Sequence, residues 1–178
     1  VDASAGHTPR LPMPLQIYSW NVNGIRACEK KGFSTWLAST GAFAIGLQEV
    51  RAKEAVIPEA ARNPAGYFSH FVAAEKAGYS GVGLYGERSP DEVHVSLGDP
   101  ALDREGRLQM ARFGRLWIFN GYFPNGSGKD RDQSRVPYKL DFYRAVQARA
   151  DAVVARGDHV IVMGDFNTAH CEIDLARP

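Results

Sequence analysis

HVIVMGDFNTAH, residues 159–170, is the stretch that decides the fold. It opens with an unbroken apolar run, Val160 to Met163, closed by a glycine, which is the pattern of a short strand buried on both faces. Asp165 and Asn167 come directly after that strand. Because Asp and Asn are also ordinary turn residues, this stretch alone leaves a turn and a functional site equally open. The decision depends on whether other strands end in the same way.

Three further apolar stretches also end on polar groups. LQIYSW (15–20) predicts a first strand, FAIGLQE (43–49) predicts a second, and residues 116–123 predict the second arm of a hairpin that turns at Gly114. Including the last strand, the polar residues at the four ends are Asn21 and Asn23, Glu49, Tyr122 and Asn125, and Asp165 and Asn167. If these ends share one edge, they gather two carboxylates, several amides and a phenol.

The remaining pattern predicts a mixed α/β chain with more strands than helices. The expected helices are residues 28–40, stopped by Gly41, and residues 135–156, with a weakly helical stretch at 52–63. The other expected strands are residues 67–74, 81–86 and 93–97.

Length and composition predict one domain over residues 15–178, after a flexible tail at residues 1–14. The two cysteines, Cys28 and Cys171, are far apart, which excludes a disulfide scaffold and a thiolate zinc site and suits a reducing cytoplasm. No apolar run approaches membrane-spanning length. With a net charge of +1, a protein that binds nucleic acid must concentrate its positive charge locally. The candidates are Arg26, Arg51, Lys129, Arg131 and Arg135.

The polar set at the strand ends is rich in hard oxygen ligands. Such a set suits Mg²⁺, or Mn²⁺ in its place, and is poor for zinc or copper. Amide N–H groups and a phenol can donate to phosphoryl oxygens as charge builds on them. The chemistry predicted from these residues is therefore hydrolysis of a phosphoester.

Five stretches together resemble, in order and spacing, the exonuclease III family of apurinic/apyrimidinic endonucleases, within the endonuclease/exonuclease/phosphatase superfamily. They are IYSWNVNGIRA from Ile17, GLQEVRAKEA from Gly46, GYSGVGLYGER from Gly78, GYFPNGS from Gly121 and VIVMGDFNTAHCEIDLARP from Val160. The resemblance implies a four-layered α/β sandwich of two packed β-sheets flanked by helices. It implies a monomeric Mg²⁺-dependent enzyme that cleaves double-stranded DNA 5′ to abasic sites, with 3′→5′ exonuclease and 3′-phosphatase activity at 3′ ends.

The same resemblance implies a role for each candidate residue. Glu49 would be the principal metal ligand, supported by Asn21, with Asp165 and Asn167 also within the metal site. Asp165 would position or deprotonate the attacking water, Asn167 would hold the scissile phosphate, and Tyr122 would donate to it. The residues expected to contact phosphate or DNA are Asn23, Arg26, Arg51, Asn125 and His170.

The family pattern also contains a later Ser-Asp-His segment with a catalytic histidine, which this sequence does not reach. We therefore expect these residues to be the N-terminal two-thirds of the domain, with exposed apolar faces on the FAIGL and HVIVM strands and weak cleavage on their own. Two alternatives remain open at this stage: a superfamily phosphatase acting on inositol phosphates or lipids, and a non-catalytic DNA-binding fragment.

Overall fold

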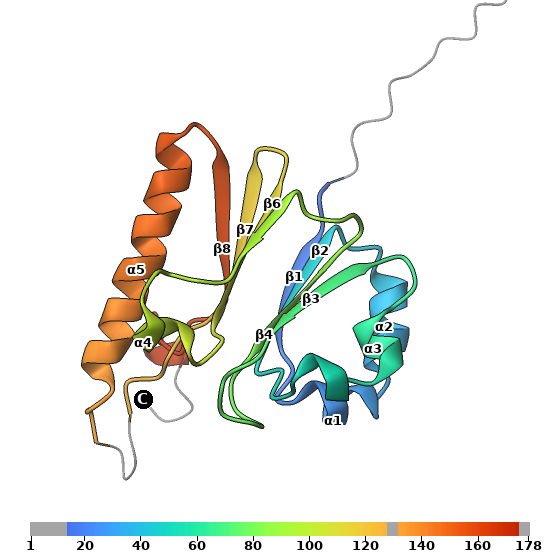
Figure 1. Ribbon diagram of the computed structural model, residues 1–178, viewed down its shortest axis with the longest axis horizontal. Helices are drawn as coiled ribbons and strands as arrows, with labels where there is room; N and C mark the ends of the chain where they lie inside the picture. Colours follow the sequence, from blue (N-terminus) through green and yellow to red (C-terminus); the bar gives the residue numbers. More distant parts are fainter. Residues whose placement is uncertain (1–13, 128–131, 175–178) are drawn as a thin grey trace, which may run out of the picture.

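The computed structural model describes residues 14–127 and 132–174, so nearly all of the predicted N-terminal tail lies outside the described residues. Two four-stranded sheets pack face to face, and helices cover the outer face of each sheet (Figure 1). The predicted four-layered α/β sandwich is thus confirmed. Within the described residues, no helix is both long and apolar enough to cross a membrane.

The first sheet has the strand order β1-β2-β4-β3 and the second the order β5-β6-β7-β8. The strands of the first are β1 (Ile17–Asn21), β2 (Ala44–Gln48), β3 (Phe68–Val72) and β4 (Val82–Gly86). Those of the second are β5 (Glu92–His94), β6 (Leu108–Phe113), β7 (Leu116–Tyr122) and β8 (His159–Asp165). Only the pairs β1·β2 and β7·β8 are parallel among these neighbours.

The parallel pairs explain why the polar strand ends meet two by two, one pair in each sheet. Parallel neighbours run in the same direction, so their carboxyl ends lie at the same edge of a sheet. The register pairs Asn21 with Gln48 in one sheet and Tyr122 with Asp165 in the other. Hydrogen bonds from Tyr122 to Glu49 and from Asn21 to Asp165 then join the edges of the two sheets, so the predicted shared edge is confirmed for all four strands.

Helices α1 (Ile25–Glu29), α2 (Phe33–Thr40) and α3 (Glu59–Arg62) cover the first sheet, whereas α4 (Pro100–Asp103) and α5 (Val136–Ala155) cover the second (Figure 1). Two short 3₁₀ helices are η1 (Glu54–Val56) and η3 (Glu172–Asp174). The prediction of one helix over residues 28–40 is wrong: Gly32, with φ +93°, breaks it in two. Gly41 ends α2 in the left-handed conformation, as predicted. Helix α4 was not predicted, because a single turn carries no apolar periodicity.

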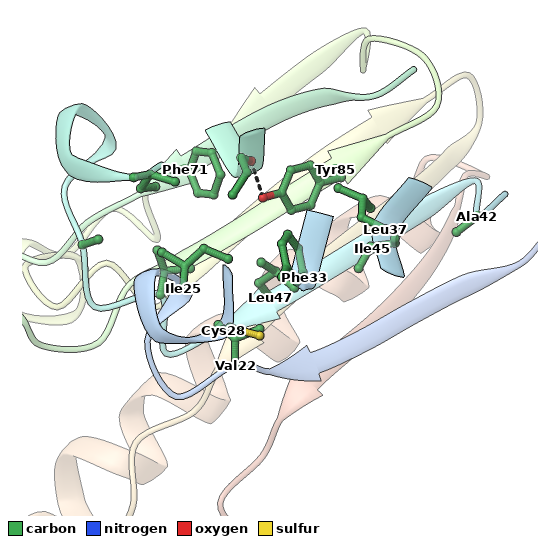
Figure 2. Packing of buried hydrophobic residues seen from close by; sticks show 14 residues of the cluster. Val22, Ile25, Cys28, Phe33, Leu37, Ala42, Ile45, Leu47, Phe71 and Tyr85 are labelled. Carbon is green, nitrogen blue, oxygen red and sulfur yellow. Dashed lines mark hydrogen bonds between the residues drawn. The ribbon is translucent and has the colours of Figure 1, made fainter. Parts of the chain in front are cut away.

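A core of buried side chains fills the space between the first sheet and its helices (Figure 2). Phe33 of α2 packs against Tyr85 of β4, with ring centroids 5.7 Å apart. The Tyr85 hydroxyl is fully buried and donates to the backbone oxygen of Ala61 at 2.6 Å. On the second sheet, α5 buries Phe142, Val146, Ala150 and Val153, the face expected from helical spacing.

The space between the two sheets is apolar at one end and polar at the other. Phe43, Leu84 and Ile118 are among its buried apolar residues. Nearer the polar strand ends its buried residues become Gln48, Gln109 and Asn120. The polar strand ends therefore continue into a layer of buried amide side chains between the two sheets.

The predicted exposure of apolar strand faces is confirmed only in part. All five residues of β2 are buried, because β2 lies inside its sheet with helices on one face and the second sheet on the other. The prediction for the FAIGL strand is therefore wrong. The edge strand β8 is half-buried, and its Ile161 side chain is 38% exposed.

Candidate active site

Glu49 lies directly after β2, held between a phenol and a guanidinium. The Tyr122 hydroxyl, from the other sheet, donates to one carboxylate oxygen of Glu49. Arg51 donates to the other oxygen at 2.9 Å. The Glu49 side chain is 14% exposed, and its backbone adopts φ +54°, a conformation uncommon for glutamate that clusters at functional sites. This carboxylate is thus fixed at the junction of the two sheets.

Asp165, at the end of β8, is fixed by two hydrogen bonds. Its Oδ2 accepts from the Asn21 side-chain amide at 2.8 Å, and its Oδ1 accepts from the backbone N–H of Asn167 at 3.0 Å. The side-chain Oδ1 of Asn21 accepts in turn from the backbone N–H of Asn23. The Asn167 amide donates to the Phe123 backbone oxygen at 2.9 Å. Asn21, Glu49, Tyr122, Asp165 and Asn167 are therefore brought together, as predicted, and both sheets contribute.

Tyr122 is set up as a hydrogen-bond donor. Burial, and then its hydrogen bond to Glu49, raise the pKa of the Tyr122 phenol to about 12. The phenol therefore keeps its proton at neutral pH. A protonated phenol at the mouth of the site can donate to an anionic substrate oxygen.

Arg107 is a residue at this site that sequence reasoning missed. Its side chain is only 4% exposed, and its guanidinium lies 4.6 Å from the centre of the Tyr122 ring. It donates to the Tyr122 backbone oxygen and to the Tyr79 hydroxyl, each at 2.9 Å. Glu105 accepts from Arg107 at 2.6 Å and from Arg135 at 2.9 Å. In a chain with 21 lysines and arginines, no local pattern distinguished this one.

A cleft of about 690 Å³ opens beside the site. Arg26, Lys30 and Arg51 are among its lining residues, so two of the predicted DNA-contacting arginines share one surface. Arg135 is not among these lining residues and pairs with Glu105, and its contact with DNA stays a prediction. The predicted contacts Lys129 and Arg131 lie outside the described residues.

Two other predicted residues are not drawn into the cluster. Asn125 and His170 are both exposed, and neither side chain forms a hydrogen bond with the residues that the structure describes. The backbone N–H of His170 donates to Asp174 at 3.1 Å, which ties down the loop after β8. Their predicted contacts with phosphate or DNA stay predictions.

The oxygen donors at the strand ends fit a hard divalent cation. Across residues 14–127 and 132–174, no group of three or more His, Cys, Asp or Glu side chains gathers as a metal site. Magnesium commonly needs only one or two carboxylates and leaves its other positions to water and substrate phosphate. Glu49 and Asp165, supported by the Asn21 amide, match that requirement, whereas zinc sites in proteins usually include histidine or cysteine.

The model of the endonuclease/exonuclease/phosphatase family matches residues 18–178. The chain belongs to this family. The chain is 30% identical over 165 residues to a DNA-(apurinic or apyrimidinic site) endonuclease of Dictyostelium discoideum, covering 92% of this chain and 45% of that protein. It is 31% identical over 165 residues to an exodeoxyribonuclease of Bacillus subtilis, covering 92% of this chain and 63% of that enzyme.

A solved relative shares the fold of this family member. It is the 3′ phosphatase NExo from Neisseria bound to product DNA hairpin, with a TM-score of 0.75 and 25% identity over 89% of this chain and 60% of that one. The resemblance to apurinic/apyrimidinic endonucleases and exonuclease III is confirmed by these relatives. The chain spans about half the length of the curated relatives that it matches.

Proposed function

We propose that the chain carries the catalytic centre of a Mg²⁺-dependent DNA repair nuclease. The reaction is cleavage of the DNA backbone 5′ to an abasic site, with 3′→5′ exonuclease and 3′-phosphatase activity on 3′ ends. The observation that carries the proposal is the meeting of Glu49, Tyr122 and Asp165 across the two sheets. Relatives named as an abasic-site endonuclease, an exodeoxyribonuclease and a 3′ phosphatase support each activity.

Glu49, with Asn21 beside it, would hold the magnesium ion. The ion, when bound, would neutralise charge on the substrate phosphate. Glu49 keeps lone pairs free on both oxygens, because each accepts only one hydrogen bond within the described residues. Mn²⁺ prefers the same oxygen donors and should substitute.

Side chains of the protein would activate the water, bind the phosphate and contact the DNA. Asp165 accepts two hydrogen bonds that fix its orientation, and its free lone pairs can take a proton from the attacking water. Tyr122 donates to a non-bridging phosphate oxygen as negative charge develops on it. Asn167 holds the scissile phosphate from the loop after β8. Arg26 and Arg51, on the wall of the cleft, contact the DNA backbone.

The test is cleavage of a duplex that contains one abasic site, with Mg²⁺ and with EDTA. We expect weak cleavage, and only with the metal. Tyr122→Phe removes one donor to the developing charge and should lower kcat by about 10²–10³-fold. Glu49→Gln should raise the magnesium concentration needed for half-maximal rate. Glu54→Gln, an exposed glutamate on η1, is the matched control and should behave as wild type.

Two results would contradict the proposal. Hydrolysis of inositol phosphates or phosphoinositides in place of DNA would identify a superfamily phosphatase. Binding of the abasic duplex without cleavage at any metal concentration would identify a non-catalytic DNA-binding unit.

A further inference from the structure

A pair of buried amides joins the two sheets directly beneath the candidate site. Asn120 of β7 is fully buried, and Gln48 of β2 is 1% exposed. The Asn120 amide nitrogen donates to the backbone oxygens of Leu47 and Gly83 at 3.2 and 2.9 Å. Its Oδ1 accepts from the Gln48 amide at 2.7 Å. Every one of these partners belongs to the opposite sheet.

The pair adjoins the two residues whose contact closes the site. Gln48 immediately precedes Glu49. Asn120 lies two residues before Tyr122, so both side chains project from the same face of β7. The bridge therefore lies two residues along β7 from the contact between Tyr122 and Glu49.

The sequence leaves room for this bridge at Gly46. A Cβ atom at Gly46 would lie 2.6 Å from the Asn120 Oδ1 and 2.6 Å from the Met163 methyl group. Both distances are far below van der Waals contact. Glycine at this position is what lets the Asn120 amide approach β2.

Burial of two amides is not required for packing, because the neighbouring space between the sheets is filled by apolar side chains such as Leu84 and Ile118. Replacing both partners of a buried hydrogen bond by apolar groups of the same shape is nearly neutral for stability. Apolar contacts are non-directional, however, whereas a hydrogen bond constrains both distance and angle. The amide pair thus supplies a constraint on the relative position of the sheets that an apolar pair would not.

We propose that Gln48 and Asn120 are positioning residues that hold Glu49 of the first sheet in place relative to Tyr122 of the second. This inference rests on the proposed function for its effect on catalysis. The placement of Tyr122 beside Glu49 can also be measured without any substrate.

The kinetic test compares Gln48→Met, Asn120→Leu and the double variant. Each single variant leaves a buried amide group unpaired and should lower the thermal midpoint. The double variant should regain only the part of that loss that comes from the Gln48–Asn120 hydrogen bond, because the backbone oxygens of Leu47 and Gly83 still lose their donor. If the pair positions the site, kcat of the double variant stays about 10²-fold low while KM for DNA changes little. Recovery of kcat together with stability would show a purely structural role and overturn the inference.

The substrate-free test follows the Tyr122 signal in protein labelled at the tyrosine ring carbon that bears the hydroxyl. Tyr122→Phe assigns the signal. We expect one sharp signal in the wild type, and a broadened signal moved towards that of free tyrosine in the double variant. His70→Leu is the matched control, because it removes another inter-sheet hydrogen bond, from Gln109 to a strand with no site residue. An unchanged Tyr122 signal in the double variant would overturn the inference.

Gly46→Ala provides a second variant if the double variant does not fold, since it pushes on Asn120 without removing an amide. It should produce the same change in the Tyr122 signal, and an unchanged signal would again overturn the inference. Failure of the wild type to cleave DNA, by contrast, would count against the proposed function alone, because the signal reports position without catalysis.

Discussion

Arg107→Met removes the guanidinium behind Tyr122 while keeping most of the apolar volume of the side chain. Three contacts are lost at once: the ion pair with Glu105, the hydrogen bond to the Tyr122 backbone oxygen and the hydrogen bond to Tyr79. The cation–π contact with the Tyr122 ring at 4.6 Å is lost as well. The change therefore acts on both the stability of the fold and the position of the phenol.

The loss of folding stability depends on the hydrogen-bond partners that Glu105 retains. Removing one partner of a buried ion pair costs about 3–5 kcal/mol, because the other charge is left unpaired. Glu105 still accepts from Arg135 at 2.9 and 3.1 Å, so the lower end, about 3 kcal/mol, applies. At ~2–4 °C per kcal/mol for a domain of this size, the thermal midpoint should fall by about 6–12 °C. Since domains have ~5–15 kcal/mol of stability, the variant should remain folded at 25 °C.

The assay measures thermal unfolding and cleavage of the abasic duplex on the same samples. We expect kcat to fall by about 10–10²-fold, because Tyr122 loses the groups that orient it. Arg107→Lys should recover part of both losses, since it keeps the charge but not the planar fork. Arg104→Met, three residues away and exposed, is the matched control. An unchanged kcat in folded Arg107→Met would refute the positioning of Tyr122 by this arginine.

Three further predictions follow from individual contacts. Burial raises the pKa of Glu105, but hydrogen bonds from two arginines outweigh burial and hold that pKa below the usual 4.5. The contribution of ionised Glu105 to the stability of the fold is therefore complete above pH 4.5 and is lost as the pH falls through the lowered pKa. Glu105→Gln should flatten the acid limb of a pH–stability curve. Tyr85→Phe leaves the Ala61 oxygen unpaired and should cost about 1–2 kcal/mol by denaturant unfolding with no change in kcat; a lowered kcat would contradict this. Arg26→Ala should reduce the slope of log affinity for DNA against log salt by about one, whereas Arg115→Ala, before the opposite end of β7, should leave that slope unchanged.

The two pairs of polar strand ends could be predicted because each pair depends only on strand direction and strand ends. Apolar runs that stop at Asn21, Glu49, Tyr122 and Asp165 are visible one at a time in the sequence. Once β1 pairs with β2 and β7 with β8 in parallel, those ends meet two by two, and the packing of one sheet on the other then brings the two pairs together. Local chemistry and one topological rule were sufficient for this part of the site.

The supporting residues could not be predicted, because their roles depend on how the two sheets are placed against each other. Arg107 stands before a strand and Asn120 inside one, and neither position has a local signature. Their contacts join segments 15 and 73 residues apart in the chain. The break at Gly32 has a local signal, the glycine itself. The helical spacing of apolar residues begins only at Phe33, so it gives no support for a helix before Gly32.

Beside the hydrogen bond from Asn21 to Asp165, two further contacts join the sheets at this site, and substrate binding affects them differently. If Tyr122 donates to the phosphate as proposed, its hydroxyl must leave the Glu49 oxygen, because a phenol has a single proton to donate. Binding of substrate thus exchanges that contact for one with the DNA. The bridge between Gln48 and Asn120 is buried away from the substrate and can persist through the exchange. A site divided between two sheets therefore needs its permanent connection below the reacting groups, where this chain places it.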